Sequence, residues 1–504
     1  MSARRSALLC LDSGTTVVKA AVFDREGRVI ASAQRENRAL RRDGDRVEQD
    51  MGLSRDDAFE VLRICASQTS VRIDGILVTG QGDGLWSLDA DLQPVGPAMT
   101  WLDGRTRQLI ASLGLSGHLS RIREVTWSRP TSATQSLQLL WLKQNSPDRI
   151  QRIAHALRLK EWLFYSLTGE LLAEPSAILP TWGSWRTGAV SRTVQDVLGL
   201  SRGLELLPTL SPVSACRAGL SATAAKTLGL LEGTPVLQGP GDVQSTLIGL
   251  GLGLRPGVSR ASIFGTSAIH AAHVTDADAI NPSPEGAIVL KFVLGDGYFH
   301  LHPCFNGATV LQHLRGLVTA LPERVEPAYS SVIVQPFFEP AGERAPYTTP
   351  DALGSVLGIN AETSPAQIAW AAREALAFIG RKSYQAMQVG LGPIALGGGL
   401  ANDRHFASFF ATVMNATIER VFSGHASLRG LAAIGAKFIL GEPDGAVSGV
   451  WCGGADDRAS PQGAMIRQYA ERKFAVFERL AECVAAEWPC LRTLQNSLVD
   501  ERAR

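Results

Sequence analysis

Short apolar runs separated by polar turns open this chain. Segments 7–11, 17–23 and 29–33 are rich in apolar and β-branched residues, with Asp12–Thr16 and Asp24–Gly27 between them. Such runs, joined by such turns, are typical of β-strands connected as hairpins. The pattern therefore predicts a β-meander at the start of the chain.

The same pattern of strand, Gly-Thr turn and strand returns near the middle of the chain. Strand-like runs at 258–264 and 268–274 flank Gly265–Ser267, and two more follow at 287–294 and 298–303. A unit that recurs about half a chain length later predicts two similar α/β domains that face each other.

Helical patterns accompany the strands in both halves. Ser364 and Pro365 form a typical N-cap and first helical residue, and apolar residues then recur at helical spacing as far as Ile379. Further helices are predicted at 137–143, 157–167, 403–414, 431–440 and 466–486.

The length of the chain implies more than one domain. One hydrophobic core supports about 250–300 residues, and this chain has 504. We place the boundary in the glycine-rich segment 247–257, with an N-terminal domain at 1–249 and a C-terminal domain at 250–504. The glycines there fit a hinge or a plain turn, and the sequence leaves both open.

Charge and cysteine content narrow the class of protein. The 49 basic residues balance 48 acidic ones, which argues against a basic surface that binds nucleic acid. No apolar run is long enough to predict a membrane span. The seven scattered cysteines lack metal-ligand spacing and favour a reduced, cytoplasmic protein with buried thiols. The oligomeric state stays open, a homodimer included.

The first hairpin turn carries groups suited to phosphate and metal. Gly14 lets the backbone approach a phosphate closely, and the hydroxyls of Thr15 and Thr16 add donors. The carboxylate of Asp12 suits water-mediated binding of Mg²⁺. An ordinary polar turn explains these residues when they are taken alone. Gly265-Thr266 repeats the turn in the other half, and two facing hairpins would clamp a polyphosphate from both sides.

A carboxylate follows the glycines of another turn. Asp242 comes after Gly239-Pro240-Gly241 at a predicted strand end. It is well placed as a general base, because the glycines leave room for a substrate hydroxyl. It also fits the N-cap of a helix predicted at 243–250, and one residue can serve both roles.

A third glycine-rich turn follows the apolar strand predicted at 394–396. Gly397, Gly398 and Gly399 form it, and Asn402 lies close behind. Bare backbone there fits a platform for a flat nucleotide base. A tight turn between a strand and a helix fits the same residues.

Two loops combine amides, carboxylates and tryptophans. Gln81, Gly82 and Asp83 follow a predicted strand, and Trp101 and Asp103 repeat the mixture. Their polar groups can hydrogen-bond hydroxyls, and indole rings can stack on the C–H faces of a polyhydroxylated ligand. Core packing is the alternative role for the tryptophans.

Together, these segments resemble the FGGY family of carbohydrate kinases, within the actin-like ATPase superfamily. The resemblance runs from about Ala7 to about Leu440 and rests on DSGTTVVKA, RVEQD, VTGQGDG, WLDGR, LTGE, GPGDVQS, FGTSA, GERAPY, IALGGG and GLAAIGA in this order. It implies an α/β fold of two ribonuclease-H-like domains with ATP in the cleft between them.

The resemblance also implies a role for each motif. Asp242 matches the catalytic base that accepts a substrate proton, and Asp12 matches the residue that holds Mg²⁺ through water. The other matches imply phosphate binding by Thr15, Thr16 and Gly265-Thr266, adenosine binding by Gly397, Gly398, Gly399 and Asn402, and sugar or polyol binding by Gln81, Gly82, Asp83, Trp101 and Asp103.

Two segments depart from common members of the family. Gly82-Asp83 replaces the Arg-Glu pair of glycerol kinases and the Met-His pair of xylulose kinases. GQGDG is more similar to erythritol kinases and, more distantly, to L-xylulose kinases. Ser427 and Arg429 stand where many members have an acidic residue and an alanine.

The resemblance therefore implies an ATP-dependent kinase that phosphorylates a terminal hydroxyl of a small polyol or ketose. Erythritol is the first expectation, and L-xylulose or another pentulose or pentitol is the alternative. A nucleotide-binding sugar sensor without catalysis, or an actin-like ATPase with a protein client, are alternatives from other classes.

Overall fold

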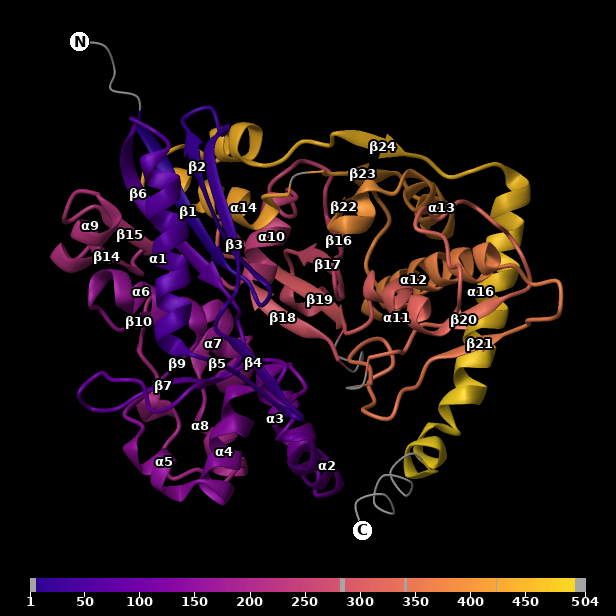
Figure 1. Cartoon of the computed structure of the whole chain (residues 1–504), viewed down its shortest axis with the longest axis horizontal. Helices are drawn as coiled ribbons and strands as arrows, with labels where there is room; N and C mark the ends of the chain where they lie inside the picture. The colour runs from indigo at the N-terminus through magenta and orange to yellow at the C-terminus, as the bar shows by residue number, and fades with distance from the viewer. Residues whose placement is uncertain (1–5, 282–285, 340–341, 423, 495–504) are drawn as a thin grey trace.

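Two lobes lie side by side, each built on one central β-sheet (Figure 1). The computed structural model describes residues 6–281, 286–339, 342–422 and 424–494. The first lobe contains the indigo and purple part of the chain, and most of the second lobe is orange. The predicted pair of α/β domains is confirmed as a fold.

The first sheet has the strand order β14-β15-β6-β1-β2-β3. Strand β1 is antiparallel to β2 and parallel to β6, and β6 is parallel to β15. The strands are β1 (Ser6–Ser13), β2 (Val17–Asp24), β3 (Val29–Glu36), β6 (Arg72–Gly80), β14 (Arg217–Gly219) and β15 (Pro235–Gln238).

The second sheet repeats this arrangement, with the order β18-β19-β17-β16-β22-β23-β24. Strand β16 is antiparallel to β17 and parallel to β22, which is parallel to β23. The repeat predicted from two Gly-Thr turns is therefore a repeat of whole sheets. The strands are β16 (Arg260–Phe264), β17 (Ala268–Val274), β18 (Ile288–Lys291), β19 (Tyr298–Cys304), β22 (Ile394–Gly397), β23 (Ile418–Arg420) and β24 (Asp457–Ala459).

Helices cover both faces of the first sheet. Leu9 and Leu11 of β1 pack in a cluster with α1 (Met51–Ser67) and α6 (Leu159–Thr168). Leu8 and Cys10, which alternate with them, pack in another cluster with α10 (Asp242–Gly249) and α14 (Ala426–Phe438). This second cluster also contains Leu301 and other residues of the second sheet, so the lobes share a core.

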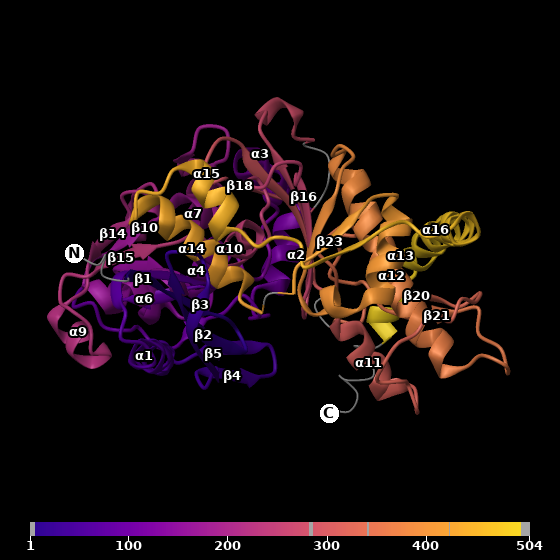
Figure 2. The ribbon, with the colours of Figure 1, turned by 90° about the horizontal axis from the view of Figure 1, so that it is seen from above.

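The helices α10 and α14 touch through glycine. A Cβ atom on Gly430 would lie 1.8 Å from the carbonyl oxygen of Ser245, and one on Gly249 would lie 1.9 Å from that of Ala426. Although α14 comes late in the sequence, it packs against the first sheet, where it lies beside the indigo strands (Figure 2). The C-terminal half therefore contributes a helix to the first lobe.

Helices also cover the outer face of the second sheet. Phe264 and Leu396 pack in a cluster with α12 (Pro365–Met387), α13 (Arg404–Met414) and α16 (Ala464–Ala485). Ser364 caps α12 in a capping box with Gln367, which confirms the predicted start of this helix.

Smaller elements complete the lobes. The remaining helices are α2 (Arg107–Leu115), α3 (His118–Thr126), α4 (Gln135–Asn145), α5 (Pro147–Arg152), α7 (Pro175–Trp182), α8 (Arg192–Val197), α9 (Ala222–Leu228), α11 (Thr309–Leu317) and α15 (Asp444–Ala446). The paired short strands are β4 (Leu40–Asp43), β5 (Arg46–Gln49) and β8 (Ala98–Met99); β7 (Trp86–Leu88) and β9 (His155–Leu157); β10 (Leu172–Ala173) and β13 (Thr209–Leu210); β11 (Gly183–Ser184) and β12 (Ala189–Val190); β20 (Ile333–Gln335) and β21 (Ser355–Leu357).

Three sequence predictions need adjustment. The helix predicted at 431–440 begins earlier, at Ala426, and the one predicted at 157–167 begins at Leu159, after the short strand β9. Five of the seven cysteines are buried, but Cys483 and Cys490 are exposed, so the expectation of buried thiols fails for these two. No helix within the described ranges is long and apolar enough to cross a lipid bilayer.

Candidate active site

A cavity of about 210 Å³ lies between the two sheets. In the first lobe, it is lined by residues that follow β1, β6 and β15, which are parallel to one another, so their carboxyl ends meet at one edge. In the second lobe, it is lined by side chains of β17, β18 and β19. Of the residues singled out in the sequence, the cavity brings together Thr15, Gln81, Gly82, Asp83, Trp101 and Asp242.

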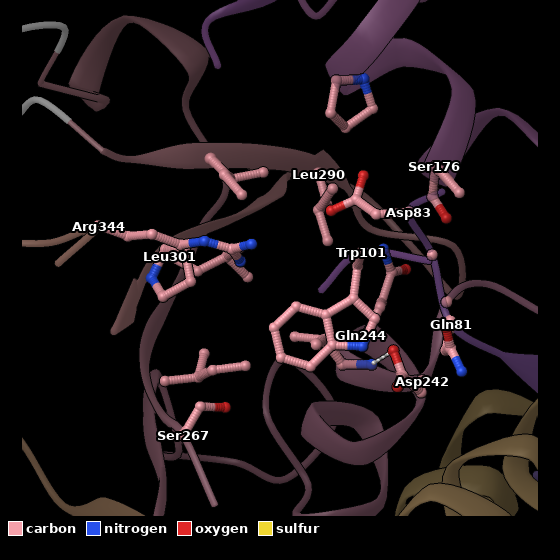
Figure 3. A pocket seen from close by; sticks show the side chains of 18 of the residues that line it. Gln81, Asp83, Trp101, Ser176, Asp242, Gln244, Ser267, Leu290, Leu301 and Arg344 are labelled. Atoms are coloured by element: carbon pink, nitrogen blue, oxygen red, sulfur yellow. Dashed lines mark hydrogen bonds between the residues drawn. The ribbon is translucent and has the colours of Figure 1, made fainter. Parts of the chain in front are cut away.

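Asp242 is the first residue of α10 and projects into the cavity (Figure 3). Burial raises the pKa of its carboxyl to about 7, and the carboxylates of Asp12 and Asp83 act in the same direction. The hydrogen bond from the Val243 N–H, at 2.9 Å, and the charge of Lys19 oppose this rise. Asp242 can therefore take up a proton near neutral pH.

The proposed capping role of Asp242 is wrong. The N-cap of α10 is Gly241, and no side chain caps this helix. Among the residues that the structure describes, the Asp242 carboxylate accepts a hydrogen bond only from the neighbouring Val243 N–H, at 2.9 Å. Its other lone pairs are therefore available to a ligand in the cavity.

Asp12 is the last residue but one of β1 and lies beside the same site. Its Oδ2 atom accepts a hydrogen bond from Ser427 of α14 and lies 3.5 Å from the Lys19 Nζ atom. Its Oδ1 atom is buried and has no hydrogen-bond partner among the described residues. A buried carboxylate oxygen without a protein partner fits a metal ion held through water.

The two Gly-Thr hairpins face the cavity from opposite lobes. The Gly14 N–H donates to the Val17 carbonyl at 3.1 Å, and the Gly265 N–H donates to the Ser267 carbonyl at 3.0 Å. Thr15 of the first hairpin and Ser267 of the second both line the cavity. Thr16 and Thr266 occupy the same turns but do not line it.

The loop after β6 touches the loop that carries Asp242. A Cβ atom on Gly241 would lie 3.3 Å from the Gly82 Cα atom, a tight contact, whereas one on Gly82 would lie at an ordinary 3.8 Å from the Gly241 Cα atom. The Gln81 amide donates to the Gln49 Oε1 atom at 3.0 Å, which leaves its own oxygen buried and unpartnered within the described chain. Burial raises the pKa of Asp83, against the charges of Arg344 and Arg158.

Trp101 lines the cavity, but Asp103 does not. The Trp101 indole N–H donates to the Thr15 hydroxyl at 2.8 Å, so it ties its loop to the first hairpin. Asp103 is buried and accepts hydrogen bonds from the Val47 N–H at 3.0 Å and from Arg105 at 2.7 Å. We therefore assign Asp103 to the support of this loop and not to the substrate.

A second cavity, of about 600 Å³, lies in the second lobe and is lined by Gly399 and Asn402 together with Arg324 and Arg373. Gly398 has a φ of +85°, and a Cβ atom on it would lie 2.4 Å from the Phe264 carbonyl oxygen. The turn is therefore tight, and it packs directly on the end of β16. Gly397 is buried behind it, so the tight turn is present, and Gly399 and Asn402 that follow it border a cavity.

Among the polar residues of the first cavity, Gln244 and Arg344 were not predicted from the sequence as site residues. Gln244 is buried, and neither its amide oxygen nor its amide nitrogen has a hydrogen-bond partner in the described residues. It lies two residues after Asp242 on the same first helical turn, which is the signal that could have found it. Arg344 also lines the cavity, and its motif GERAPY was noted without a role for this residue.

Comparisons with known families identify this arrangement. The N-terminal domain of the FGGY family of carbohydrate kinases matches residues 7–249, and the C-terminal domain of the same family matches residues 261–438. The chain belongs to the FGGY family. This FGGY protein is accordingly a carbohydrate kinase with the two-domain fold of the family.

Relatives of this FGGY kinase differ in the substrates that their names give. Erythritol kinase of Brucella abortus is 28% identical, over 85% of this chain and 88% of that enzyme. Glycerol kinase of Rhodospirillum rubrum is 29% identical, over 84% of this chain and 90% of that enzyme. The crystal structure of gluconate kinase from Lactobacillus acidophilus has a TM-score of 0.87 at 18% identity, and the match covers 97% of this chain and 100% of that one.

Proposed function

We propose that this kinase transfers the γ-phosphate of ATP to a terminal hydroxyl of a small polyol, and that erythritol is its substrate. The observation that carries the proposal is the position of Asp242. Its carboxyl, with a pKa raised to about 7, projects into a 210 Å³ cavity between the lobes.

Asp242 performs the proton transfer in this proposal. Its carboxylate accepts the proton of the terminal hydroxyl, and the oxygen attacks the γ-phosphorus in line with the leaving oxygen of ADP. The hydroxyl oxygen gains the phosphoryl group, and Asp242 then returns its proton to solvent. Gln244, with both amide atoms available, holds the reacting end of the polyol beside Asp242.

The nucleotide occupies the space between the hairpins and the second cavity. Backbone N–H groups and hydroxyls at Thr15, Thr16 and Gly265-Thr266 hold the phosphates, and Gly399 and Asn402 border the adenosine. Asp12 would hold Mg²⁺ through water, and the bound ion would neutralise charge on the transferring phosphoryl group. The unpartnered Oδ1 atom of Asp12 supports this assignment.

The choice of erythritol rests on the cavity and on the relatives. Gln81 and Asp83 provide hydroxyl acceptors, and apolar side chains such as Ile269 and Leu301 form the opposite wall. This combination fits a small neutral ligand that is hydroxylated along one edge. The match to erythritol kinase of Brucella abortus over most of both chains supports the same choice.

A coupled assay of ADP release tests the substrate. The full chain is assayed with ATP and Mg²⁺ against erythritol, other tetritols, pentitols, glycerol, ketopentoses including L-xylulose, and gluconate. We expect the highest kcat/KM for erythritol. A higher value for L-xylulose or a pentitol contradicts erythritol but leaves the mechanism intact. Tight ATP binding without any phosphorylated product contradicts catalysis and favours a sensor.

A further inference from the structure

Arg344 is a cavity residue that the proposed mechanism does not use. Its guanidinium carbon lies 4.3 Å from the ring centre of Phe305 and 5.5 Å from that of Trp101. Trp101 belongs to the first lobe and Phe305 follows β19 in the second, so Arg344 lies where the lobes meet. Its Nε and Nη2 atoms are buried without a hydrogen-bond partner among the residues that the structure describes.

The backbone beneath Arg344 is held firmly. The Glu343 carboxylate accepts hydrogen bonds from the N–H groups of Phe305, at 2.6 Å, and Arg344, at 2.8 Å, and from the Asn306 amide at 2.9 Å. Burial raises the pKa of Glu343 to about 7, and these hydrogen bonds act against the rise. This clamp fixes the loop to the end of β19, so the arginine is presented from a rigid base.

Asp83 lies opposite Arg344. The two side chains enter the cavity from different lobes, and their charged ends point toward one another (Figure 3). Burial lowers the pKa of Arg344, and the charge of Asp83 opposes this effect most strongly. Within the described chain, no ion pair or hydrogen bond joins the two side chains directly, although their charges interact.

A ligand between them must satisfy a donor and an acceptor. A carboxylate such as Asp83 accepts hydrogen bonds, whereas a guanidinium only donates them. A hydroxyl group does both at once, since it donates through its hydrogen and accepts through its lone pairs. A ligand carboxylate would pair with Arg344, but it would be repelled by Asp83 and Asp242, which share the cavity.

We propose that Arg344 and Asp83 together bind the hydroxyl at the end of the polyol that is not phosphorylated. This inference rests on the proposed function, and it makes Arg344 the residue that selects neutral polyols of at least four carbons. In a three-carbon polyol with its reacting hydroxyl at Asp242, the other terminal hydroxyl lies one carbon nearer to Asp242 and falls short of this pair. Because the two side chains come from different lobes, the same hydroxyl also bridges the lobes.

The test compares erythritol with an analogue that lacks only the distal hydroxyl, 1,2,3-butanetriol of matching stereochemistry. For Arg344→Gln in the full chain, we expect the KM for erythritol to rise about 10- to 100-fold, the range for losing a hydrogen bond to a charged group. We expect KM for the triol, or its Ki as a competitive inhibitor, to change less than about 3-fold. The KM for ATP should stay unchanged. Arg344→Lys keeps the positive charge but loses the paired N–H donors of the guanidinium, so its KM for erythritol should lie between those of the unmodified protein and Arg344→Gln.

Two further variants sharpen the test. Asp83→Asn should also raise the KM for erythritol, and the double variant Asp83→Asn/Arg344→Gln should lose less than the sum of the two, because one hydroxyl serves both side chains. Arg28→Gln, which changes an exposed arginine paired with Asp24 outside the cavity, is the matched control and should leave every constant unchanged.

The outcomes separate this inference from the proposed function. An equal loss for erythritol and the triol, or a raised KM for ATP, would show that Arg344 only supports the structure and would overturn the inference. An unchanged KM for erythritol overturns it as well. If the unmodified protein prefers another polyol, erythritol is wrong as the substrate, and the same comparison applies to that polyol and its distal deoxy analogue.

Discussion

The hairpins β1–β2 and β16–β17 occupy the same place in two sheets of the same topology, but their chemistry differs. In the first hairpin, Asp12 lies directly across from Lys19. In the second, Ile263 lies directly across from Ile269. A pair of opposite charges in one lobe thus corresponds to a pair of apolar side chains in the other.

The difference shows that two lobes with the same sheet topology contribute different chemical groups to the cavity. The first lobe supplies the carboxylates of Asp12, Asp83 and Asp242, whereas the second supplies an apolar wall that includes Ile269 and Leu301. Carboxylates that lie close together raise one another's pKa, which suits a general base. Burying a second set of carboxylates in the other lobe would add a further desolvation cost. Among the described residues that line the cavity, the second lobe contributes the cation of Arg344 and no further carboxylate to be desolvated.

The largest effect is expected for the base itself. Asp242→Asn should lower kcat by about 100- to 10,000-fold, because an amide cannot accept the hydroxyl proton. Steady-state ADP release with erythritol measures this loss. Asp148→Asn is the matched control, since Asp148 is an exposed acidic residue in the first turn of α5. A comparable loss of kcat in the control would mean that removing an acidic residue from the first turn of a helix, and not the loss of a base, explains the result.

The comparison of the hairpins predicts the next largest effect. Asp12→Asn should lower kcat by about 100-fold or more, the cost of removing one electrostatic contact to the transition state, and raise the Mg²⁺ concentration needed for half-maximal rate. Ile263→Val, at the corresponding position, should leave kcat and the Mg²⁺ dependence unchanged. An equal loss of kcat in the two variants would contradict the inference that only the first hairpin supplies a charged group to the reaction.

The turn that carries Gly398, beside the second cavity, offers a test of stability. Gly398→Ala forces a Cβ atom to within 2.4 Å of the Phe264 carbonyl oxygen at a φ of +85°. We expect a loss of about 1–3 kcal/mol in the free energy of unfolding and a raised KM for ATP. Gly399→Ala is the control, because its Cβ atom would lie 4.0 Å from the same oxygen. Urea unfolding measures the free energy of unfolding of both variants. Equal values would contradict the inference that only a Cβ atom at position 398 strains the turn.

The smallest effect concerns pH. The rise in the pKa of Asp242 to about 7 predicts that kcat/KM for the polyol falls as the pH drops below 7, because the protonated carboxyl cannot act as a base. Asp83→Asn removes a like charge, which favours the ionised form of Asp242, so this limb should move to lower pH by less than about one unit. A limb that moves to higher pH would contradict the assigned coupling.

Local sequence patterns predicted the elements but not the contacts between distant ones. The strands at 7–11, 17–23 and 268–274 were found because apolar runs and turns are local signals. The start of α14 was missed because polar Ser427 and Arg429 lie in its first turns. The hydrogen bond of Ser427 to Asp12 joins residues 415 positions apart in the chain, and no local pattern records it.

The candidate site followed the same rule. Residues at strand ends, such as Asp83 and Asp242, were predictable because parallel strands end at one edge of the sheet. Arg344 was not, since a loop between β20 and β21 brings it to the cavity from the second lobe. Asp103 was predicted to contact the substrate because it lies in the same loop as Trp101, but its side chain accepts hydrogen bonds from Val47 and Arg105 instead.

Single-turnover transfer by Asp242→Asn tests the central claim most directly, because it separates the chemical step from product release. Enzyme in excess over ATP is mixed with saturating erythritol at pH 8, where the carboxyl of the unmodified protein is ionised, and phosphorylated erythritol is measured over time. We predict that the variant binds ATP and erythritol as the unmodified protein does but transfers phosphate at least about 100-fold more slowly. Transfer within a few-fold of the unmodified rate would contradict the assignment of Asp242 as the base.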